Sequence, residues 1–339
     1  MTTKGIVFTA PCIAELIDVN LPPVGDNDVL INTMVTCLSS GTERANLIGD
    51  ENVGPFSPPK PAVFPRTAGY SCSGIVEQVG KNVKDIKVGD RVCAYWTKHA
   101  KRLVMNQNNV IKIDSDDISF NEAAFSFITC FPMAAIRKCR IETGESAMVM
   151  GQGLLGLFAV KLLKASGAVP IIAVDPNPEK RKVAIKNGAD YALDPFEEGF
   201  AKKVKEITGG GVKVCIEVTG NGPALDMALD CMAMFGRVAL LGCTRHSDFS
   251  IDYYRKVHGP GITMIGAHTV ARPDNESHPG WWTHRDDMKS FLKLLKYKRL
   301  EVKSMIEEIH TPDECGEVYA RLAVEKSFPI VQFDWSKME

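Results

Sequence analysis

Residues 146–175 read SAMVMGQGLLGLFAVKLLKASGAVPIIAVD, and this stretch decides the fold. A short apolar run ending at Met150 is followed by the three glycines of a GxGxxG pattern at 151–156. A mostly apolar segment without internal Gly or Pro then extends to Gly167, and a second apolar run ends at Asp175. The pattern predicts a strand, a tight turn, a helix and a second strand.

The glycines and the acid of this stretch predict a dinucleotide site. Gly151 suits a tight reversal, Gly153 lets a pyrophosphate approach, and Gly156 lets the helix pack closely on the sheet. The phosphates are expected at the helix N-terminus, where unpaired N–H groups and the helix dipole favour an anion. Asp175, about 20 residues after Gly156, is placed to accept the ribose hydroxyls of NAD and to repel the 2′-phosphate of NADP. The expected cofactor is NAD, held by the turn residues Gly151, Gln152, Gly153, Leu154, Leu155 and Gly156.

Composition narrows the class of partner. The chain has 339 residues, 45% hydrophobic and 24% charged, which is ordinary for two compact lobes. Its 40 basic and 41 acidic residues give a net charge of −1, so neither nucleic acid nor an anionic membrane is an expected partner, and a small-molecule substrate is. The ten cysteines are scattered without a CxxC pair, which favours reduced thiols. With no signal-like amino terminus and no stretch of membrane-spanning length, a cytoplasmic location is expected.

Two patterns divide the chain. Residues 1–120 hold short β-type runs separated by turn residues, which predicts an antiparallel, barrel-like lobe. A proline-dense loop at 49–65 is a stiff connection or, by analogy, a wall of the substrate site. From Ser119 the spacing becomes helical, and the nucleotide lobe is expected to begin about there. The predicted strands of the first lobe are 5–8, 14–19, 28–35, 73–79, 91–95 and 103–105.

After Asp175 the pattern alternates between strands and helices. Asn177 can cap a helix that Pro178 opens and Gly188 closes. Such alternation predicts a parallel, doubly wound sheet. A final run, 328–333, is expected to return as a strand to the first lobe. The predicted strands are 191–193, 212–218, 238–241 and 262–265, and the helices are 197–208, 223–234, 285–295 and 312–323.

Four motifs resemble the medium-chain dehydrogenase/reductase family, the zinc-type alcohol dehydrogenase superfamily. They are AGYSCSGIVEQVG (68–80), VGDRV (88–92), the glycine turn, and KNGADYALD (186–194). The resemblance implies an α/β fold with a GroES-like β-barrel catalytic domain at 1–120 and 268–339. It places a Rossmann domain at 121–267. It also implies a homodimer or homotetramer, paired through the strand at 262–265.

The sequence departs from this family at the metal site. By the resemblance, the zinc ligands fall on Ser40, on Tyr70 and near Phe125, while Ser71 stands in place of a glutamate. Hydroxyl groups of Ser or Tyr do not serve as zinc ligands at neutral pH. The four-cysteine loop that often follows VGDRV is missing too. We therefore expect a zinc-free member with no metal site.

Without zinc, hydrogen bonds must stabilise the oxygen of the reacting alcohol and a base must take its proton. The candidates near the substrate pocket are Ser40, Thr42, Glu43 and Tyr70. By the resemblance, Thr42 matches a hydroxyl residue that contacts the substrate oxygen, and Trp96 matches an aromatic pocket wall.

The role of each candidate has an alternative. Glu43 is the more specific candidate for the general base, although it can equally hold the SSGTE turn through backbone N–H groups. Tyr70 is a hydrogen-bond donor or acid, or else an aromatic filler of the vacated metal cavity. His99 is attractive by residue type, because histidine is the side chain suited to proton transfer near neutral pH, but a surface or structural role is expected.

Further cofactor contacts are expected in the second half. Thr129 matches a residue that leans on the nicotinamide, although a helix-start hydroxyl explains it too. Arg181 either stacks on adenine or lies in solvent. Ligands of doubly wound folds bind beyond the carboxyl ends of the strands, which adds Val218, Thr219, Gly242, Cys243, Thr244, Gly266, Ala267 and His268.

The combination predicts a zinc-independent, NAD-dependent dehydrogenase of a secondary alcohol, such as a polyol or sugar-like hydroxyl. The SSGTE stretch is similar to that of the bacteriochlorophyllide dehydrogenase-like branch, which oxidises a hydroxyethyl group. Two alternatives remain. One is a zinc-free quinone or enoyl reductase, but such enzymes usually prefer NADPH and would lack the acid at Asp175. The other is a non-catalytic nucleotide-binding protein.

Overall fold

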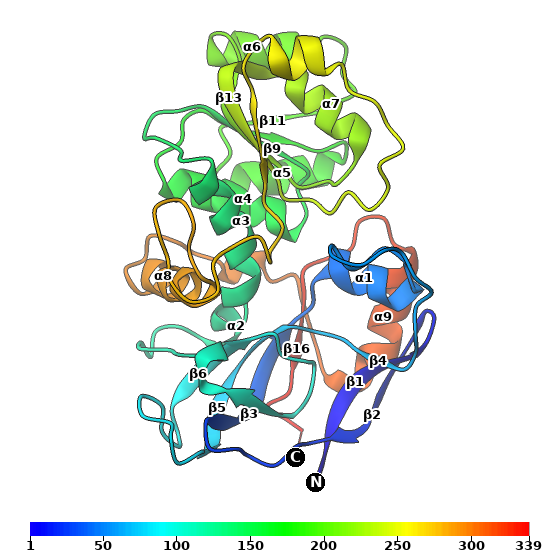
Figure 1. Cartoon of the computed structure of the whole chain (residues 1–339), viewed down its shortest axis with the longest axis vertical. Helices are drawn as coiled ribbons and strands as arrows, with labels where there is room; N and C mark the ends of the chain where they lie inside the picture. The colour runs from blue at the N-terminus through cyan, green and yellow to red at the C-terminus, as the bar shows by residue number, and fades with distance from the viewer. Residues whose placement is uncertain (339) are drawn as a thin grey trace. The chain divides into compact units, whose positions relative to one another are not determined.

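The computed structural model describes residues 1–338, which form two compact units (Figure 1). The first contains residues 1–128 and those from 288 onward, and the second contains Thr129–Asp287. The sequence placed the boundaries at 120/121 and 267/268, so the second unit begins and ends later than predicted. The segment 268–287 stays with the second unit because ion pairs, described below, tie it to the helix that begins this unit.

The first unit is built on two antiparallel sheets. A three-stranded sheet has the order β2-β1-β4, and a larger sheet has the order β15-β16-β3-β5-β6-β8 with β7 paired to β3. Strand β16 pairs antiparallel with β3, which confirms the predicted return of the chain to the first lobe. The bounds are β1 Thr2–Ala10, β2 Ile13–Asn20, β3 Asp28–Cys37, β4 Arg66–Thr67, β5 Ser71–Val79, β6 Arg91–Tyr95, β7 Arg102–Asn106, β8 Val110–Lys112, β15 Glu308–His310 and β16 Val331–Asp334.

Two helices close the core of this unit. Helix α1 (Ser40–Ile48) begins in the SSGTE turn, and α9 (Cys315–Val324) packs on it and on β2. Phe8, Tyr319, Phe333 and Trp335 are fully buried in the cluster between them. The other helical segments of this unit are α2 (Phe120–Ala123) and the short 3-10 turns η1 (Gln107–Asn109), η3 (Lys303–Met305) and η4 (Pro312–Glu314). Helices α3 (Ser126–Lys138) and α8 (His284–Lys296) each contain a boundary between the two units.

The second unit is a six-stranded parallel sheet with the order β11-β10-β9-β12-β13-β14, which confirms the doubly wound prediction (Figure 1). Met148 and Met150, alternate residues of β9, pack against side chains of α6 and α7. Helix α4 contacts β9 and β10. The bounds are β9 Ala147–Met150, β10 Ile171–Val174, β11 Tyr191–Leu193, β12 Val212–Glu217, β13 Met232–Leu240, β14 Thr263–Gly266, α4 Leu154–Ala165, α5 Pro178–Lys186, α6 Phe200–Thr208, α7 Gly222–Asp230 and the π-helical turn η2 Tyr254–His258.

Local signals predicted some boundaries and missed others. The Asn177 side chain accepts a hydrogen bond from the Glu179 N–H at 2.8 Å, so the predicted cap of α5 is confirmed. The helix predicted to reach Met234 instead ends at Asp230, and β13 begins at Met232. The pairing of Met232 with Val212 of β12 outweighs helix propensity there.

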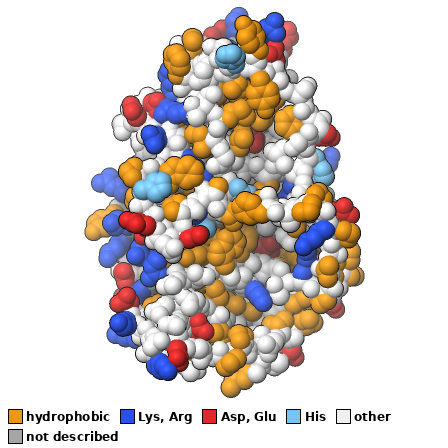
Figure 2. Space-filling view, in the orientation of Figure 1, with side chains coloured by type: hydrophobic (Ala, Val, Ile, Leu, Met, Phe, Trp, Pro, Cys, Tyr) orange, Lys and Arg blue, Asp and Glu red, His pale blue; other side chains and the backbone are white. Residues whose placement is uncertain are grey.

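The face drawn in Figure 2 shows no extended region of one charge. Figure 2 shows basic and acidic side chains interspersed over the visible face. No helix among residues 1–338 has the length and apolar character needed to cross a bilayer. Eight of the ten cysteines are buried, while Cys12 and Cys243 are exposed.

Candidate functional site

The predicted cofactor residues converge on one edge of the parallel sheet. Strand register places Met150, Val174, Glu217, Leu240 and Gly266 in a single row across the sheet. These residues end their strands, so the row is the carboxyl edge, where doubly wound folds bind ligands. The residues predicted to contact the cofactor follow this row or belong to its end: the 151–156 turn, Asp175, Val218, Thr219, Gly242, Cys243, Thr244, Gly266, Ala267 and His268.

The glycine turn fits a dinucleotide pyrophosphate. Gly151 adopts a φ of 94°, and a Cβ on Gly156 would lie 1.9 Å from the Gly151 carbonyl oxygen. A Cβ on Gly153, the residue before α4, would meet no atom within 4 Å. The turn therefore leaves open space directly at the helix N-terminus, where backbone N–H groups attract phosphate.

Asp175 is fixed in place at the same edge. Its Oδ2 accepts a hydrogen bond from the Gln152 N–H at 2.8 Å, and its Oδ1 accepts one from the Asn177 N–H at 2.8 Å. Each carboxylate oxygen retains a further lone pair for a ribose hydroxyl. Arg181 does not extend freely into solvent, because its guanidinium binds the Asp194 carboxylate at 3.0 Å and the Asp175 carbonyl at 2.8 Å.

Glu217 is a buried acid at this edge that the sequence analysis missed. It is 1% exposed, and its carboxylate accepts hydrogen bonds from the N–H groups of Thr219 at 2.7 Å and Gly220 at 3.1 Å. Burial raises its pKa, and these hydrogen bonds oppose the shift. Glu217 therefore shapes the turn that presents Thr219. An acid inside the apolar run VKVCIEV was the available signal.

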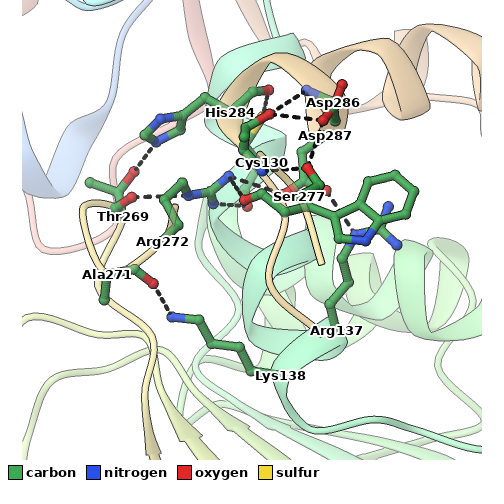
Figure 3. Close-up of polar contacts among 12 residues, drawn as sticks. Cys130, Arg137, Lys138, Thr269, Ala271, Arg272, Ser277, His284, Asp286 and Asp287 are labelled. Atoms are coloured by element: carbon green, nitrogen blue, oxygen red, sulfur yellow. Dashed lines mark hydrogen bonds and ion pairs between the residues drawn. The ribbon is translucent and has the colours of Figure 1, made fainter. Parts of the chain in front are cut away.

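A buried ion-pair network supports the last strand ends (Figure 3). The Asp287 carboxylate is bound by Arg137 Nε at 2.8 Å and by Arg272 Nη1 at 3.0 Å. Arg272 also donates to the carbonyls of Cys130 at 2.8 Å and Thr269 at 3.1 Å. These contacts link α3 to the segment that follows β14. The network thereby holds the loop of Gly266, Ala267 and His268 against the unit.

Lys138 contacts this loop directly. Its Nζ donates to the carbonyls of Gly266 at 2.9 Å and Ala271 at 2.6 Å, and it lies 4.5 Å from the ring centroid of Trp281. Burial lowers the pKa of Lys138 to about 8. The predicted nicotinamide residue Thr129 is fully buried in α3, on the same helix as Lys138.

The shifted pKa of Lys138 predicts a pH effect on stability. Between about pH 8 and the usual lysine pKa of 10.5, the unfolded chain binds more protons at this position, so the free energy of unfolding should rise with pH there. Lys138→Met should remove that rise. Urea unfolding of the wild type, Lys138→Met and the exposed-lysine control Lys202→Met across this range measures it. A wild-type advantage over Lys138→Met that stays constant with pH would contradict the assignment.

In the first unit, a group of hydroxyls surrounds Tyr70. The Tyr70 side chain is 8% exposed, and the side-chain hydroxyls of Ser39 and Thr42 lie near enough to its phenol to lower its pKa. Burial raises the Tyr70 pKa, the hydroxyl contacts oppose the shift, and the nearby charge of Glu43 adds to it. Tyr70 therefore stays protonated at neutral pH and acts as a hydrogen-bond donor.

Glu43 is enclosed beneath this group. It is 2% exposed, and Oε1 accepts a hydrogen bond from the Ser39 N–H at 2.8 Å. Its Oε2 accepts from Tyr319 and lies 3.0 Å from His99 Nε2. The turn-holding contact considered for Glu43 is thus present. His99 is 1% exposed, so the expected surface position is wrong.

A single proton arrangement satisfies the wider network. Trp335 Nε1 can only donate, and it binds Thr36 Oγ1 at 2.9 Å. Thr36 Oγ1 lies 2.7 Å from His99 Nδ1. If the Thr36 hydroxyl donates to Nδ1, then Nε2–H of a neutral His99 donates to Glu43, and every group is paired. The Glu43 carboxyl is thus held by contacts with Ser39, His99 and Tyr319.

Aromatic rings form the other wall around Tyr70. The Tyr70 ring lies 5.5 Å from that of Phe127 and 6.4 Å from that of Trp96, both edge to face. Trp96 is 44% exposed and packs 4.9 Å from Phe127. Tyr70 thus has hydroxyls on one side and apolar rings on the other, and Ser40 begins the adjacent α1.

The sequence resemblance assigned metal positions to Ser40, Tyr70 and the neighbourhood of Phe125, and these side chains are not zinc ligands by type. Ser40 and Tyr70 offer only hydroxyls, and Phe125 is fully buried and apolar. The Ser71 hydroxyl is already engaged with the Ala124 carbonyl at 2.6 Å. In the described part of the chain, no group of three or more His, Cys, Asp or Glu side chains is arranged to hold a metal ion.

A barrel-like unit joined to a parallel sheet with a glycine turn defines a nucleotide-dependent oxidoreductase. Residues 25–126 match the alcohol dehydrogenase GroES-like domain, and residues 155–278 match the zinc-binding dehydrogenase domain. The chain belongs to the zinc-type alcohol dehydrogenase, or medium-chain dehydrogenase/reductase, family.

Relatives of known activity are dehydrogenases. The L-threonine 3-dehydrogenase of Thermococcus kodakarensis is 33% identical over 268 residues, covering 70% of this chain and 75% of that protein. The D-guloside 3-dehydrogenase of Escherichia coli is 26% identical over 334 residues, covering 93% and 95%. The structure of galactitol-1-phosphate dehydrogenase from Escherichia coli matches with a TM-score of 0.84 at 18% identity, covering 98% and 99%, which shows the shared fold. The chain is thus an NAD(P)-dependent alcohol oxidoreductase.

Proposed function

We propose that this protein is a zinc-independent, NAD-dependent dehydrogenase that oxidises a secondary alcohol of a polyol or sugar-like substrate. The observation that carries the proposal is the set of hydroxyls around Tyr70, a residue to which the sequence resemblance assigned a metal-ligand position. The names of the relatives support the substrate class, because the 3-position of threonine and the 3-position of a guloside both carry a secondary hydroxyl.

The choice of NAD rests on charge at the carboxyl edge. Asp175 is held by two backbone N–H groups, so its carboxylate cannot swing away from a 2′-phosphate. The guanidinium of Arg181 forms an ion pair with Asp194, so its charge is already compensated and is not available to bind a 2′-phosphate. Both features favour a ribose with free hydroxyls.

The chemistry assigned to the first unit is hydrogen-bond donation. Bound NAD⁺ supplies the hydride acceptor. The protonated phenol of Tyr70 donates to the substrate oxygen, where negative charge develops as the hydroxyl proton leaves. Thr42, half-buried beside Tyr70, accepts the hydrogen bond of the substrate hydroxyl and, as it takes that proton, gives its own hydroxyl proton to solvent water. Glu43 positions Ser39 and thereby the hydroxyl group, rather than acting as the base.

A cofactor-reduction screen tests the proposal. Polyols, sugars and simple secondary alcohols are offered with NAD and NADP in parallel, and absorbance of the reduced nicotinamide is followed. We expect turnover of a secondary alcohol with a strong NAD preference. Reduction of quinones or enones alone would favour the reductase alternative. NAD binding without any turnover would favour a non-catalytic nucleotide-binding protein.

Asp175→Ser should relax the cofactor preference. Removing the carboxylate removes its repulsion of the 2′-phosphate, so we expect the ratio of kcat/KM for NAD to that for NADP to fall about hundredfold. Glu206→Ser removes the same charge from exposed α6 of the same unit and should leave the ratio unchanged. An unchanged ratio in Asp175→Ser would contradict the role given to this residue.

A further inference from the structure

The first unit contains a cavity to which the proposed function assigns no ligand, although Trp96, predicted as a wall of the substrate pocket, lines one edge of it. Its volume is about 720 Å³, within the range of small-molecule sites. The cavity lies between the three-stranded sheet β2-β1-β4 and strand β7 with the segment leading into it. All residues that line it belong to this unit.

One face of the small sheet forms the cavity wall. Thr3 and Val7 of β1 lie on this face, opposite Val19 of β2 and Thr67 of β4 respectively. The alternate residues, including Ile6 and Phe8, point to the other face and pack in the core under α9. The sheet therefore separates the cavity from the core. The residues on its cavity face are not part of the packed core on its other face.

On the opposite wall, alternate residues line the cavity from Lys98 to Arg102, and consecutive residues line it from Arg102 to Asn106. Lys98, Ala100 and Arg102 line the cavity. His99 and Lys101, between them, face inward, where His99 contacts Glu43 and Lys101 Nζ donates to the Trp335 carbonyl at 2.9 Å. The backbone register thus directs Lys98 and Arg102 to the cavity side.

The wall is apolar with a cationic edge. Its apolar side chains are Val7, Ile17, Val19, Leu21, Trp96, Leu103, Val104 and Met105 together with Pro22 and Pro65, and no Asp or Glu lines it. Arg102 is bound by Glu77 at 2.9 Å, and Arg66 donates to Asn46 Oδ1 at 3.1 Å. Lys98 is exposed, and within residues 1–338 no ion pair or hydrogen bond occupies its ammonium group.

We propose that this cavity binds a small organic anion with an apolar body and one carboxylate, such as a medium-chain carboxylic acid. The apolar body fills the space against the small sheet, where it is removed from water. The carboxylate pairs with the ammonium group of Lys98 at the edge. The absence of any lining acid leaves nothing to repel it.

Trp96 gives this site an optical signal and a physical link to Tyr70. Its indole lines the cavity and also packs on the rings of Phe127 and Tyr70. A carboxylate with no absorbance of its own would cover the 44% exposed indole and shift its emission to shorter wavelength. Trp335 is fully buried and does not respond to such coverage.

Octanoate and octanol test the proposal on the full-length protein without cofactor. We expect octanoate to bind saturably at one site per chain by calorimetry, with a blue shift of tryptophan emission that Trp96→Phe abolishes. Octanol, which lacks the charge, should bind about tenfold more weakly. Three results would overturn the proposal. They are equal affinity for octanoate and octanol, octanoate binding without any change in Trp96 emission, and no octanoate binding.

A charge reversal tests the partner assigned to the carboxylate. Lys98→Glu should weaken octanoate binding more than about tenfold, because two like charges would then meet. Lys84→Glu makes the same change at an exposed lysine of the same unit that does not line the cavity, and it should bind octanoate as the wild type does. Equal weakening by both variants would overturn the assignment. A second copy of the chain could instead cover the cavity. The protein would then sediment as a dimer and bind no octanoate, and this result would also overturn the proposal.

Discussion

Replacing Tyr70 with Phe should slow hydride transfer to NAD by about 10²–10³-fold, the usual cost of removing one hydrogen-bond donor from a developing oxyanion. The phenyl ring keeps the edge-to-face packing on Phe127, so folding should be preserved. NAD affinity should be unchanged, because Asp175 and the glycine turn lie in the other unit. The measurement is single-turnover formation of reduced nicotinamide with the best alcohol from the screen.

Two further variants make this result specific. Tyr95→Phe removes a hydroxyl from the neighbouring ring, which stacks on Phe127 at 5.3 Å, and should leave the rate unchanged. Glu43→Gln should lower the free energy of unfolding but reduce the rate less than about tenfold, because Glu43 acts through Ser39. If Glu43→Gln instead slowed the reaction as much as Tyr70→Phe and removed an ionisation from the pH–rate profile, Glu43 would be the general base.

Replacing Asp287 with Asn should destabilise the second unit by about 3–5 kcal/mol. Arg137 and Arg272 share this carboxylate, and the Arg272 side chain is only 2% exposed. Without the carboxylate, two guanidinium charges stay close together with no anion between them, and one of them is almost completely buried. Chemical denaturation followed by tryptophan fluorescence measures the effect, since Arg137 lies over the ring of Trp282 at 3.6 Å.

Asp274→Asn is the matched control. Asp274 is exposed in the same segment, so the same chemical change there should alter the free energy of unfolding by less than about 0.5 kcal/mol. If the two variants were equally stable, the network would not hold the segment after β14. Contacts other than the ion pairs of Asp287 would then have to fix the positions of Gly266, Ala267 and His268.

The nucleotide half could be predicted because its signals are local. The glycine turn, the acid at Asp175 and the Asn177 cap all lie within one stretch of about 30 residues, the length of a single βαβ unit. Once that unit is placed, parallel register carries the remaining strand ends to the same edge. The helix predicted through Met234 failed where a non-local contact, the pairing with Val212, decided the structure.

In the first unit, the residues that were expected to donate or accept protons could be predicted only by residue type, and their partners could not be predicted. Glu43 meets Tyr319, which lies 276 residues away in the sequence, and His99, which lies 56 away. Neither separation produces a periodic pattern in the sequence. The contacts form only when the first unit folds and brings Tyr319 of α9 and His99 next to Glu43. The same holds for Asp287 and Arg137, which are separated by 150 residues. Such networks become visible only when burial and distance are known.

The central claim is hydride transfer to NAD without zinc, and activity after metal removal tests it most directly. The protein is dialysed against a strong chelator, its metal content is measured by mass spectrometry, and reduction of NAD by the alcohol is followed in the same sample. We predict undiminished turnover with far less than one zinc per chain. Loss of activity on chelation, with recovery on adding one equivalent of zinc, would contradict the account.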